Sequence, residues 1–202
     1  MAKQPAVARV DRKEEVLTRI LDAFIALLTE GADDLNHDAV ADRAQLGRRT
    51  VYRYFPDRAA LMDAALLRVR ELAGPKVTYP ESAEDLIETI EPVLTGFDAH
   101  ADLFTLLRTT AQGRQLRLSQ NRQRVASYTR ALADAVKDLP PPDRKLATAL
   151  LQMLHTTPWL EMRDNWGLDG KQIARATGWA VRTLLNDLKA RGGLPLDQDL
   201  ES

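Results

Sequence analysis

The stretch from residue 36 to residue 58, NHDAVADRAQLGRRTVYRYFPDR, restricts what the chain can fold into more than any other segment. Asn36 is suited to begin a helix, because its side-chain oxygen can accept the unpaired amide protons of a first turn. Pro56 ends a second helix, since proline has no amide proton and disfavours helical geometry in the residue before it. Between them, Gln45-Leu46-Gly47 interrupts the pattern, with Leu46 as an apolar plug and Gly47 permitting the turn. The pattern predicts two short helices, at 38–44 and 48–55, arranged as a helix-turn-helix.

The second of these helices has two chemically different faces. Successive residues turn by about 100°, so Val51 and Phe55 share one face, and we expect that face to be buried. Arg49 and Arg53 fall almost opposite. The flanks of the outer face carry Arg48, Thr50, Tyr52 and Tyr54. Guanidinium and hydroxyl groups pair with phosphate oxygens and with guanine edges in a major groove wide enough for one helix.

Local charge agrees with this interpretation, although the whole chain has a net charge of only −1. Five arginines lie between residues 43 and 58, against the single acid Asp57. A basic strip on a neutral body is the electrostatic footprint expected for binding a polyanion. The same arginines also fit a solvated helix face that binds nothing, and charge alone does not separate the two. The spacing of the helices, the proline stop and the interleaved tyrosines favour DNA.

The run TVYRYFPDRAAL, preceded by a short helix and by an amphipathic helix ending in TEG, resembles the DNA-binding domain of the tetracycline-repressor (TetR) family. The resemblance covers about residues 16–67. It implies that Thr50, Tyr52 and Tyr54 contact phosphates and that Arg58 caps the next helix near the DNA backbone. It also implies that three arginines lie in or beside the groove: Arg48, Arg49 and Arg53. Asn36 and His37 complete the candidate DNA-binding residues.

The chain departs from the family pattern at the turn. The family often has Gly-Val-Ser where this chain has Gln45-Leu46-Gly47. Without the serine hydroxyl, Gly47 would begin the second helix with backbone groups alone. We therefore expect the fold of the family, with a recognition helix whose pose can differ in detail.

Composition and periodicity predict an all-α protein of about nine helices, because no segment alternates apolar and polar residues over the length of a strand. We expect an N-terminal helix-turn-helix DNA-binding domain at 1–57 and a C-terminal helical ligand-binding and dimerisation domain at 58–202. A mobile arm of about 12 residues would precede the first helix. Pro92 and Pro158 each predict a kink or a break. The expected helices are 12–30, 38–44, 48–55, 58–73, 81–99, 102–112, 114–138, 142–166 and 169–191.

Several functional classes lack support in the sequence. The chain has no cysteine, which excludes disulfides and thiolate chemistry, and it has neither a signal peptide nor an apolar run long enough for a membrane span. We therefore expect a cytoplasmic protein. Asp98, His100 and Asp102 resemble a metal-ligand set, but on a helix His100 would point away from both carboxylates. No catalytic constellation is visible, so we predict no catalytic residue, no metal, no cofactor and no enzymatic activity.

The second half carries apolar and aromatic residues interspersed with a few polar ones, which is what a small-molecule pocket between helices requires. Taken singly, most of these residues fit an ordinary core better than a ligand site. Because TetR-family regulators bind inducers in this half, the resemblance implies a pocket here, and the scarcity of convergent charge predicts a small hydrophobic effector. The candidate ligand-binding residues are Phe97, His100, Phe104, Arg108, Tyr128, Met153, His155, Trp159 and Met162.

The last two predicted helices carry more apolar surface than one small bundle can hide, which predicts a homodimer packed through them. Surplus core burial within one subunit is the alternative. On this basis we expect a ligand-responsive transcriptional repressor that binds a palindromic double-stranded DNA operator as a dimer. Two alternative functions are a helical protein-interaction module and, ranked below it, a helical enzyme. The apolar set comprises Leu146, Leu150, Met153, Leu154, Ile173, Ala176, Ala180, Val181, Leu184, Leu185 and Leu188, with Ala174, Thr177 and Gly178 allowing a close helix approach.

Overall fold

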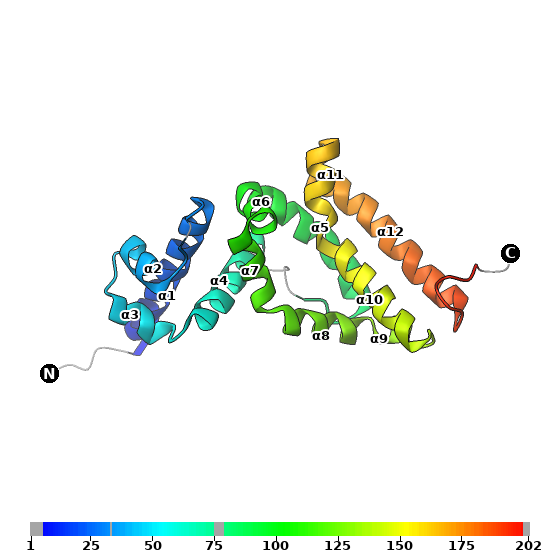
Figure 1. The fold of residues 1–202 in the computed structure, drawn as a ribbon, viewed down its shortest axis with the longest axis horizontal. Coiled ribbons are helices and arrows are strands. Elements are labelled where there is room, and N and C mark those ends of the chain that lie inside the picture. The colour runs from blue at the N-terminus through cyan, green and yellow to red at the C-terminus, as the bar shows by residue number, and fades with distance from the viewer. Residues whose placement is uncertain (1–5, 33, 75–78, 200–202) are drawn as a thin grey trace. The chain divides into compact units, whose positions relative to one another are not determined.

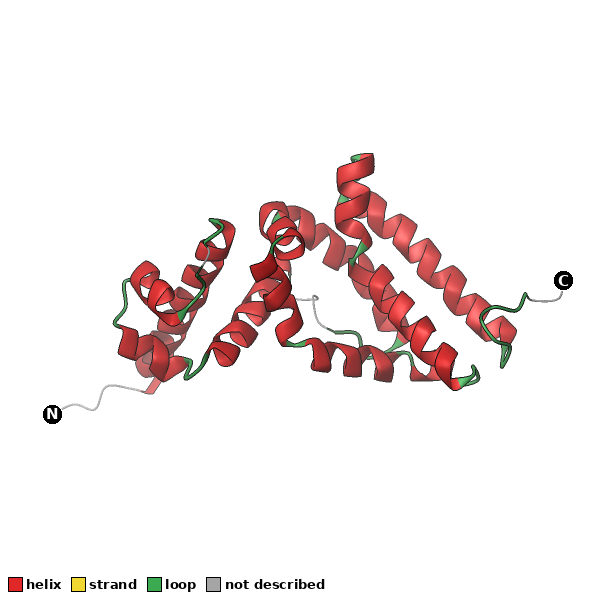
Figure 2. Ribbon diagram, viewed as in Figure 1, coloured by secondary structure: helices red, strands yellow, loops and turns green. Residues whose placement is uncertain are grey.

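The computed structural model describes residues 6–32, 34–74 and 79–199, and every regular element within these ranges is a helix (Figures 1 and 2). This confirms the all-α prediction, with twelve helices in the described residues rather than about nine. None of these helices is both long and apolar enough to cross a membrane. The helices are α1 (Ala6–Thr29), α2 (His37–Ala44), α3 (Arg48–Tyr54), α4 (Arg58–Ala73), α5 (Ala83–Ala99), α6 (Ala101–Thr109), α7 (Ala111–Ser119), α8 (Asn121–Ala131), α9 (Ala133–Val136), α10 (Pro141–Thr156), α11 (Pro158–Trp166) and α12 (Gly170–Arg191).

The extra helices arise where long predicted helices are interrupted. The predicted helix at 114–138 divides into α7, α8 and α9, with Gln120 and Leu132 at the breaks. The predicted helix at 142–166 breaks before Pro158, as expected, because proline at the first position of a new helix loses no hydrogen bond. At Pro92 a break does not occur: α5 runs through it, and its buried neighbours on either side keep the helix packed.

The N-terminal helix is longer than the sequence pattern predicts. Helix α1 begins at Ala6 rather than near residue 12, so the predicted mobile arm is wrong for residues 6–12. Residues 1–5 of the predicted arm lie outside the described residues.

The described chain divides into two compact units. The first comprises Met1–Val69 and Asp102–Gln120, and the second comprises Arg70–Ala101 and Asn121–Ser202. These packing units differ from the two functional domains predicted from the sequence, which meet between residues 57 and 58. Helix α4 contributes to both, and the predicted functional division stays a prediction.

In the first unit, α1, α2 and α3 surround a common apolar core, which includes Ile20, Phe24, Leu28, Val40 and Val51. Two further contacts attach α4 to this unit. The Arg68 guanidinium lies 3.0 Å from the Asp22 carboxylate of α1, and the Gln120 side-chain amide donates to the Asp63 carbonyl at 3.2 Å. The helix-turn-helix is thus held on a core that extends through α4.

In the second unit, α12 packs most extensively along α5. Ile173, Ala174, Thr177 and Val181 form the buried face of α12. The two backbones lie close together at Gly170, where a Cβ atom would lie only 2.5 Å from the Leu94 carbonyl oxygen. The absence of a side chain at this position therefore permits α12 to begin against α5.

Candidate nucleic-acid interface

The two helices of the helix-turn-helix begin and end largely as the sequence predicts. The Asn36 side chain accepts from the Ala39 amide at 2.9 Å and caps α2. The turn, however, depends on Gln45, which adopts left-handed geometry with φ of 51°. Gly47 has φ of −65°, so the prediction that its conformational freedom makes the turn is wrong. As expected, Gly47 begins α3 without a side-chain cap.

Helix α3 is buried on one side and exposed on the other. Val51 is fully buried and Phe55 is 5% exposed, which confirms the predicted inner face. Arg49 and Arg53 are exposed on the opposite side, as the helical geometry requires. Of the flanking tyrosines, Tyr52 is 48% exposed and Tyr54 is half-buried. The basic, hydroxyl-bearing side of α3 is therefore the side available to a partner.

The arginines of this region differ in their partners. The Arg48 guanidinium pairs with the Asp38 carboxylate at 3.0 Å, and Arg43 pairs with Glu30. Arg49 has no ion-pair or hydrogen-bond partner among the described residues. The Arg53 guanidinium lies 5.5 Å from the centroid of the Tyr54 ring. Among the described residues, Arg49, Arg53 and Arg58 thus carry positive charge that no ion pair with a carboxylate compensates, and Arg49 and Arg53 lie opposite the core.

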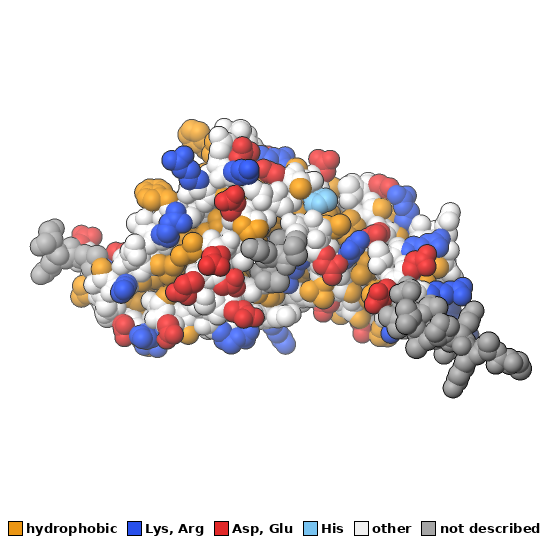
Figure 3. All heavy atoms as spheres, turned by 180° about the vertical axis from the view of Figure 1, so that it is seen from behind, with side chains coloured by type: hydrophobic (Ala, Val, Ile, Leu, Met, Phe, Trp, Pro, Cys, Tyr) orange, Lys and Arg blue, Asp and Glu red, His pale blue; other side chains and the backbone are white. Residues whose placement is uncertain are grey.

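This concentration is local. Figure 3 shows acidic and basic side chains interspersed over one face of the molecule, which agrees with a net charge near zero. A neutral surface gives a polyanion no general attraction. Selective binding of DNA would therefore depend on the short cationic strip of α3.

His37 takes a different position from the one expected of a DNA contact. Its ring is only 6% exposed, and Nε2 donates to the Phe55 carbonyl at 2.9 Å. The ring also stacks on Tyr52, with centroids 4.4 Å apart and planes within 9° of parallel. His37 therefore connects the start of α2 to the end of α3 and packs against the ring of the exposed Tyr52.

The region following α3 also differs from what the resemblance implies. The cap of α4 is Asp57, whose carboxylate accepts from the Ala60 amide at 2.8 Å. Arg58 is instead the first residue of α4; it is exposed, and its guanidinium donates to the Gln115 side chain at 3.2 Å. Thr50, the remaining candidate, is half-buried on α3.

In the second unit, Tyr128 and His155 are brought together in a buried hydrogen-bonded chain. The Thr89 hydroxyl donates to the Asp85 carbonyl at 2.6 Å, so it can only accept from His155 Nε2, which lies 3.1 Å away. His155 Nδ1 is then left as the acceptor for the Tyr128 hydroxyl. Burial lowers the pKa of His155 to about 4 and raises the pKa of the Tyr128 phenol. The histidine is thus neutral, and both of its nitrogens are used.

A second cluster joins α5, α11 and α12. The Phe97 ring meets the buried Trp159 edge to face, at 5.6 Å between centroids. The Trp159 indole donates to one oxygen of Asp98 at 2.7 Å, and the other oxygen accepts from the Gly170 amide. Asp98, considered in the sequence only as a metal ligand, therefore joins three helices. Nothing in the sequence links it to a tryptophan 61 positions away.

The other candidate ligand-binding residues are divided between the two units. Met153 is 46% exposed on α10, whereas His100 and Met162 are half-buried in the second unit. Phe104 and Arg108 belong to α6 in the first unit. Within the second unit, two pairs of candidates thus lie in contact, Phe97 with Trp159 and Tyr128 with His155, and each pair includes a side chain bonded to a polar partner in the protein.

The predicted dimer residues divide between core and surface. On α12, Ile173, Val181 and Leu188 are buried within the second unit. On α10, an exposed apolar row remains, spaced at i, i+4 and i+7: Leu146 at 59%, Leu150 at 42% and Met153 at 46%. Trp166 and Trp179 are also strongly exposed, at 78% and 69%. These side chains give the second unit an apolar surface that its own core does not cover.

Comparisons with known proteins agree with this geometry. Residues 20–65 match the family described as bacterial regulatory proteins, tetR family. These residues extend from the middle of α1 to the middle of α4 and include the whole helix-turn-helix. Over 192 residues, the chain is 27% identical to the HTH-type transcriptional repressor KstR of Rhodococcus jostii (strain RHA1). The aligned region covers 87% of this chain and 85% of that protein. The similarity to KstR therefore extends well beyond the helix-turn-helix.

Proposed function

We propose that the chain is a DNA-binding transcriptional regulator of the TetR family, a repressor that recognises a palindromic operator as a homodimer. The similar protein from Rhodococcus jostii is described as a repressor, which supports this direction of regulation. Because the target is DNA in a bacterial family, the proposed place of action is the cytoplasm. The similarity to regulators of this family supports the proposal over the two alternatives, an enzyme and a protein-interaction module.

The observation that carries the proposal is the division of α3 into a buried side and a cationic side. Arg49 and Arg53 would enter the major groove, where a guanidinium can bond to the edge of a guanine. Tyr52, Tyr54 and Thr50 would contact phosphates beside the groove and fix the register of the helix. Arg48, Arg58 and Asn36 lie at the edges of this surface, and His37 would act through Tyr52 rather than by touching DNA.

Dimerisation through the last helices is supported by the apolar row on α10. Leu146, Leu150 and Met153 are exposed side chains that association with a second copy would remove from water. Trp179, on α12, is a further exposed apolar side chain of the second unit. A two-fold pair of such subunits would present two copies of α3, and an operator with two-fold symmetry matches that arrangement.

Regulation by a small hydrophobic effector is proposed for the second half of the chain. The last turn of α4 carries Arg70, whose guanidinium lies 3.7 Å from the centroid of the Tyr79 ring. Tyr79 contacts Tyr128 edge to face, and Tyr128 is bonded to His155. An effector that displaced Tyr128 would therefore disturb the contacts of α4, the helix that follows α3 directly in the chain. A coupling of about 1–3 kcal/mol between effector and operator is typical of such regulation.

Selection of DNA from a random pool tests this function directly. The purified protein should enrich sequences with two related half-sites in inverted order, separated by about one helical turn or a multiple of it. Enrichment of an asymmetric single site would contradict the dimeric arrangement. Retention of DNA without any sequence enrichment would contradict the assignment of α3 as a reader of bases.

A further inference from the structure

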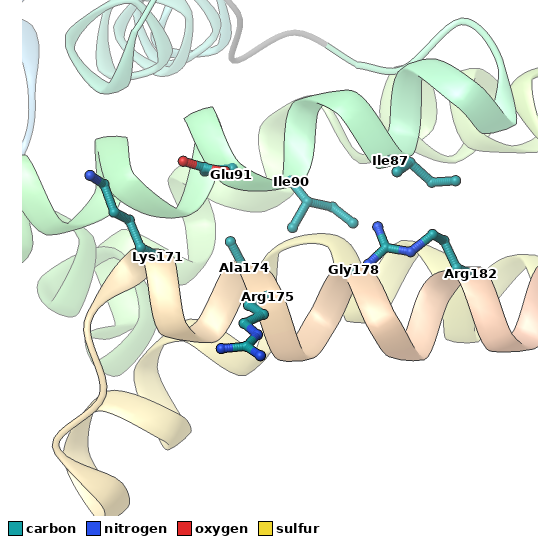
Figure 4. A pocket seen from close by; sticks show the side chains of 8 residues that line it. All are labelled: Ile87, Ile90, Glu91, Lys171, Ala174, Arg175, Gly178 and Arg182. Carbon is teal, nitrogen blue, oxygen red and sulfur yellow. The ribbon is translucent and has the colours of Figure 1, made fainter.

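A groove of about 400 Å³ lies between α5 and α12, and its lining includes none of the residues assigned above to DNA or to the effector. Its lining comes from Ile87, Ile90 and Glu91 of α5 and from Lys171, Ala174, Arg175, Gly178 and Arg182 of α12 (Figure 4). The volume falls within the range of small-molecule sites in proteins, about 300–1,000 Å³.

The floor of the groove is apolar. Ile90 and Ala174 are almost completely buried, and Ile87 is half-buried beside them. Gly178 adds no side chain to the floor, and a Cβ at this position would lie 3.2 Å from the Arg182 guanidinium. The missing side chain therefore leaves space for that guanidinium to lie across the helix at the groove.

The α12 side of the groove is cationic. Lys171, Arg175 and Arg182 follow one edge of the helix at i, i+4 and i+11, and all three are exposed. None has an ion-pair or hydrogen-bond partner among the described residues. Glu91 is the only carboxylate in the lining, so the groove carries three positive charges against one negative charge.

We propose that this groove binds a small amphipathic anion, a molecule that joins a phosphate or carboxylate to an apolar chain or ring. The anionic group pairs with Arg182 and with Arg175, whose exposed side chain turns towards α5 from the position seen in Figure 4, and the apolar part covers the half-buried Ile87. Charge complementarity decides the sign of the ligand. The apolar floor decides that the ligand is more than an inorganic anion, because bare phosphate leaves that floor uncovered.

Calorimetric titrations of the 202-residue chain without DNA test the site independently of the proposed regulatory function. The probes are decyl phosphate and decanoate, each below its micellar concentration, with decanol, decyltrimethylammonium and inorganic phosphate as controls. Saturable binding of one or both decyl anions is expected, and their relative affinities distinguish a phosphate site from a carboxylate site. The uncharged, cationic and chain-free controls bind weakly or not at all.

Two variants assign the binding to the groove. The double substitution Arg175→Gln and Arg182→Gln weakens binding of the decyl anion by about tenfold or more, because charge-assisted hydrogen bonds are lost. Gly178→Leu fills the floor and also weakens it, and circular dichroism checks that both variants are folded. Lys189→Gln, which removes an exposed cation from the same helix outside the lining, leaves binding unchanged.

Three results would overturn the proposal: no saturable binding of either decyl anion, equal binding of decanol or decyltrimethylammonium, or equal binding by folded groove variants. Sedimentation of the same variants covers one further outcome. If the double arginine substitution changes the molar mass of the protein and leaves anion binding unaltered, the groove is a contact between copies of the chain, and the ligand assignment fails.

Discussion

The buried state of His155 has a measurable consequence for stability. Burial lowers the pKa of this imidazole from 6.5 to about 4, and the nearby Asp85 carboxylate opposes that shift without cancelling it. Between these two pH values the unfolded chain binds a proton that the folded chain does not. The contribution of His155 to stability is therefore fully present above pH 6.5 and is lost as the pH falls towards 4.

The size of this effect follows from the shift of about 2.5 pH units, which corresponds to about 3 kcal/mol in total, or about 1.4 kcal/mol per pH unit within the window. Urea denaturation at pH 7, 6 and 5, followed by circular dichroism, gives the slope for the native protein. The His155→Gln variant is the comparison, because every other titrating group still contributes to its slope of unfolding free energy against pH. A smaller slope in the variant is expected. Equal slopes, or a His155 resonance that titrates near pH 6.5 in the folded protein, would refute the neutral hydrogen-bonded ring.

Three other substitutions probe different parts of the fold. Gly47→Ser should raise the free energy of unfolding by about 0.5–1 kcal/mol, because a serine hydroxyl there can cap α3 and a Cβ has room. Gly167→Ser, the comparison, should lower the free energy of unfolding, because Gly167 has a φ of +63°. Urea denaturation measures both changes. His37→Leu should lower stability by about 1 kcal/mol through loss of the hydrogen bond and ring stack at α3, and unchanged stability would show that neither matters. Leu150→Arg should shift the mass in light scattering from two chains towards one, and Leu118→Arg, at an exposed position on α7, should not.

The helix-turn-helix could be predicted closely because its signals are local. Asn36 caps the helix that follows it, and the period of 3.6 residues fixes which side of α3 carries Val51 and which carries Arg53. The turn was less predictable. Either Gln45 or Gly47 could have adopted the left-handed backbone geometry of the turn. Gln45 adopts it because α2 ends at Ala44, and the packing of α2 decides where that helix ends.

The role of His37 could not be read from its neighbours in the chain. Its hydrogen-bond acceptor, the Phe55 carbonyl, lies 18 positions away. The break between α7 and α8 is of the same kind, because Gln120 is neither glycine nor proline and bonds to Asp63 on α4. Contacts that join distant segments leave no periodic trace in the sequence.

In the second half, composition identified the aromatic and polar residues but not their partners. Tyr128 and His155 were expected near a ligand, and in the structure they bond to each other and to Thr89. The cations of the α5–α12 groove were not singled out at all. Their spacing along α12 is visible in the sequence, but the apolar floor beside them comes from a helix some 80 positions earlier.

Operator affinity of the arginine variants tests the central claim most directly. With a DNA site obtained by selection, Arg49→Ala and Arg53→Ala should each weaken binding by about 1–3 kcal/mol, which is roughly 5-fold to 150-fold. Arg122→Ala, an exposed arginine of α8 in the second unit, should leave the affinity unchanged. An operator bound as tightly after loss of both Arg49 and Arg53 would show that the cationic side of α3 does not read DNA.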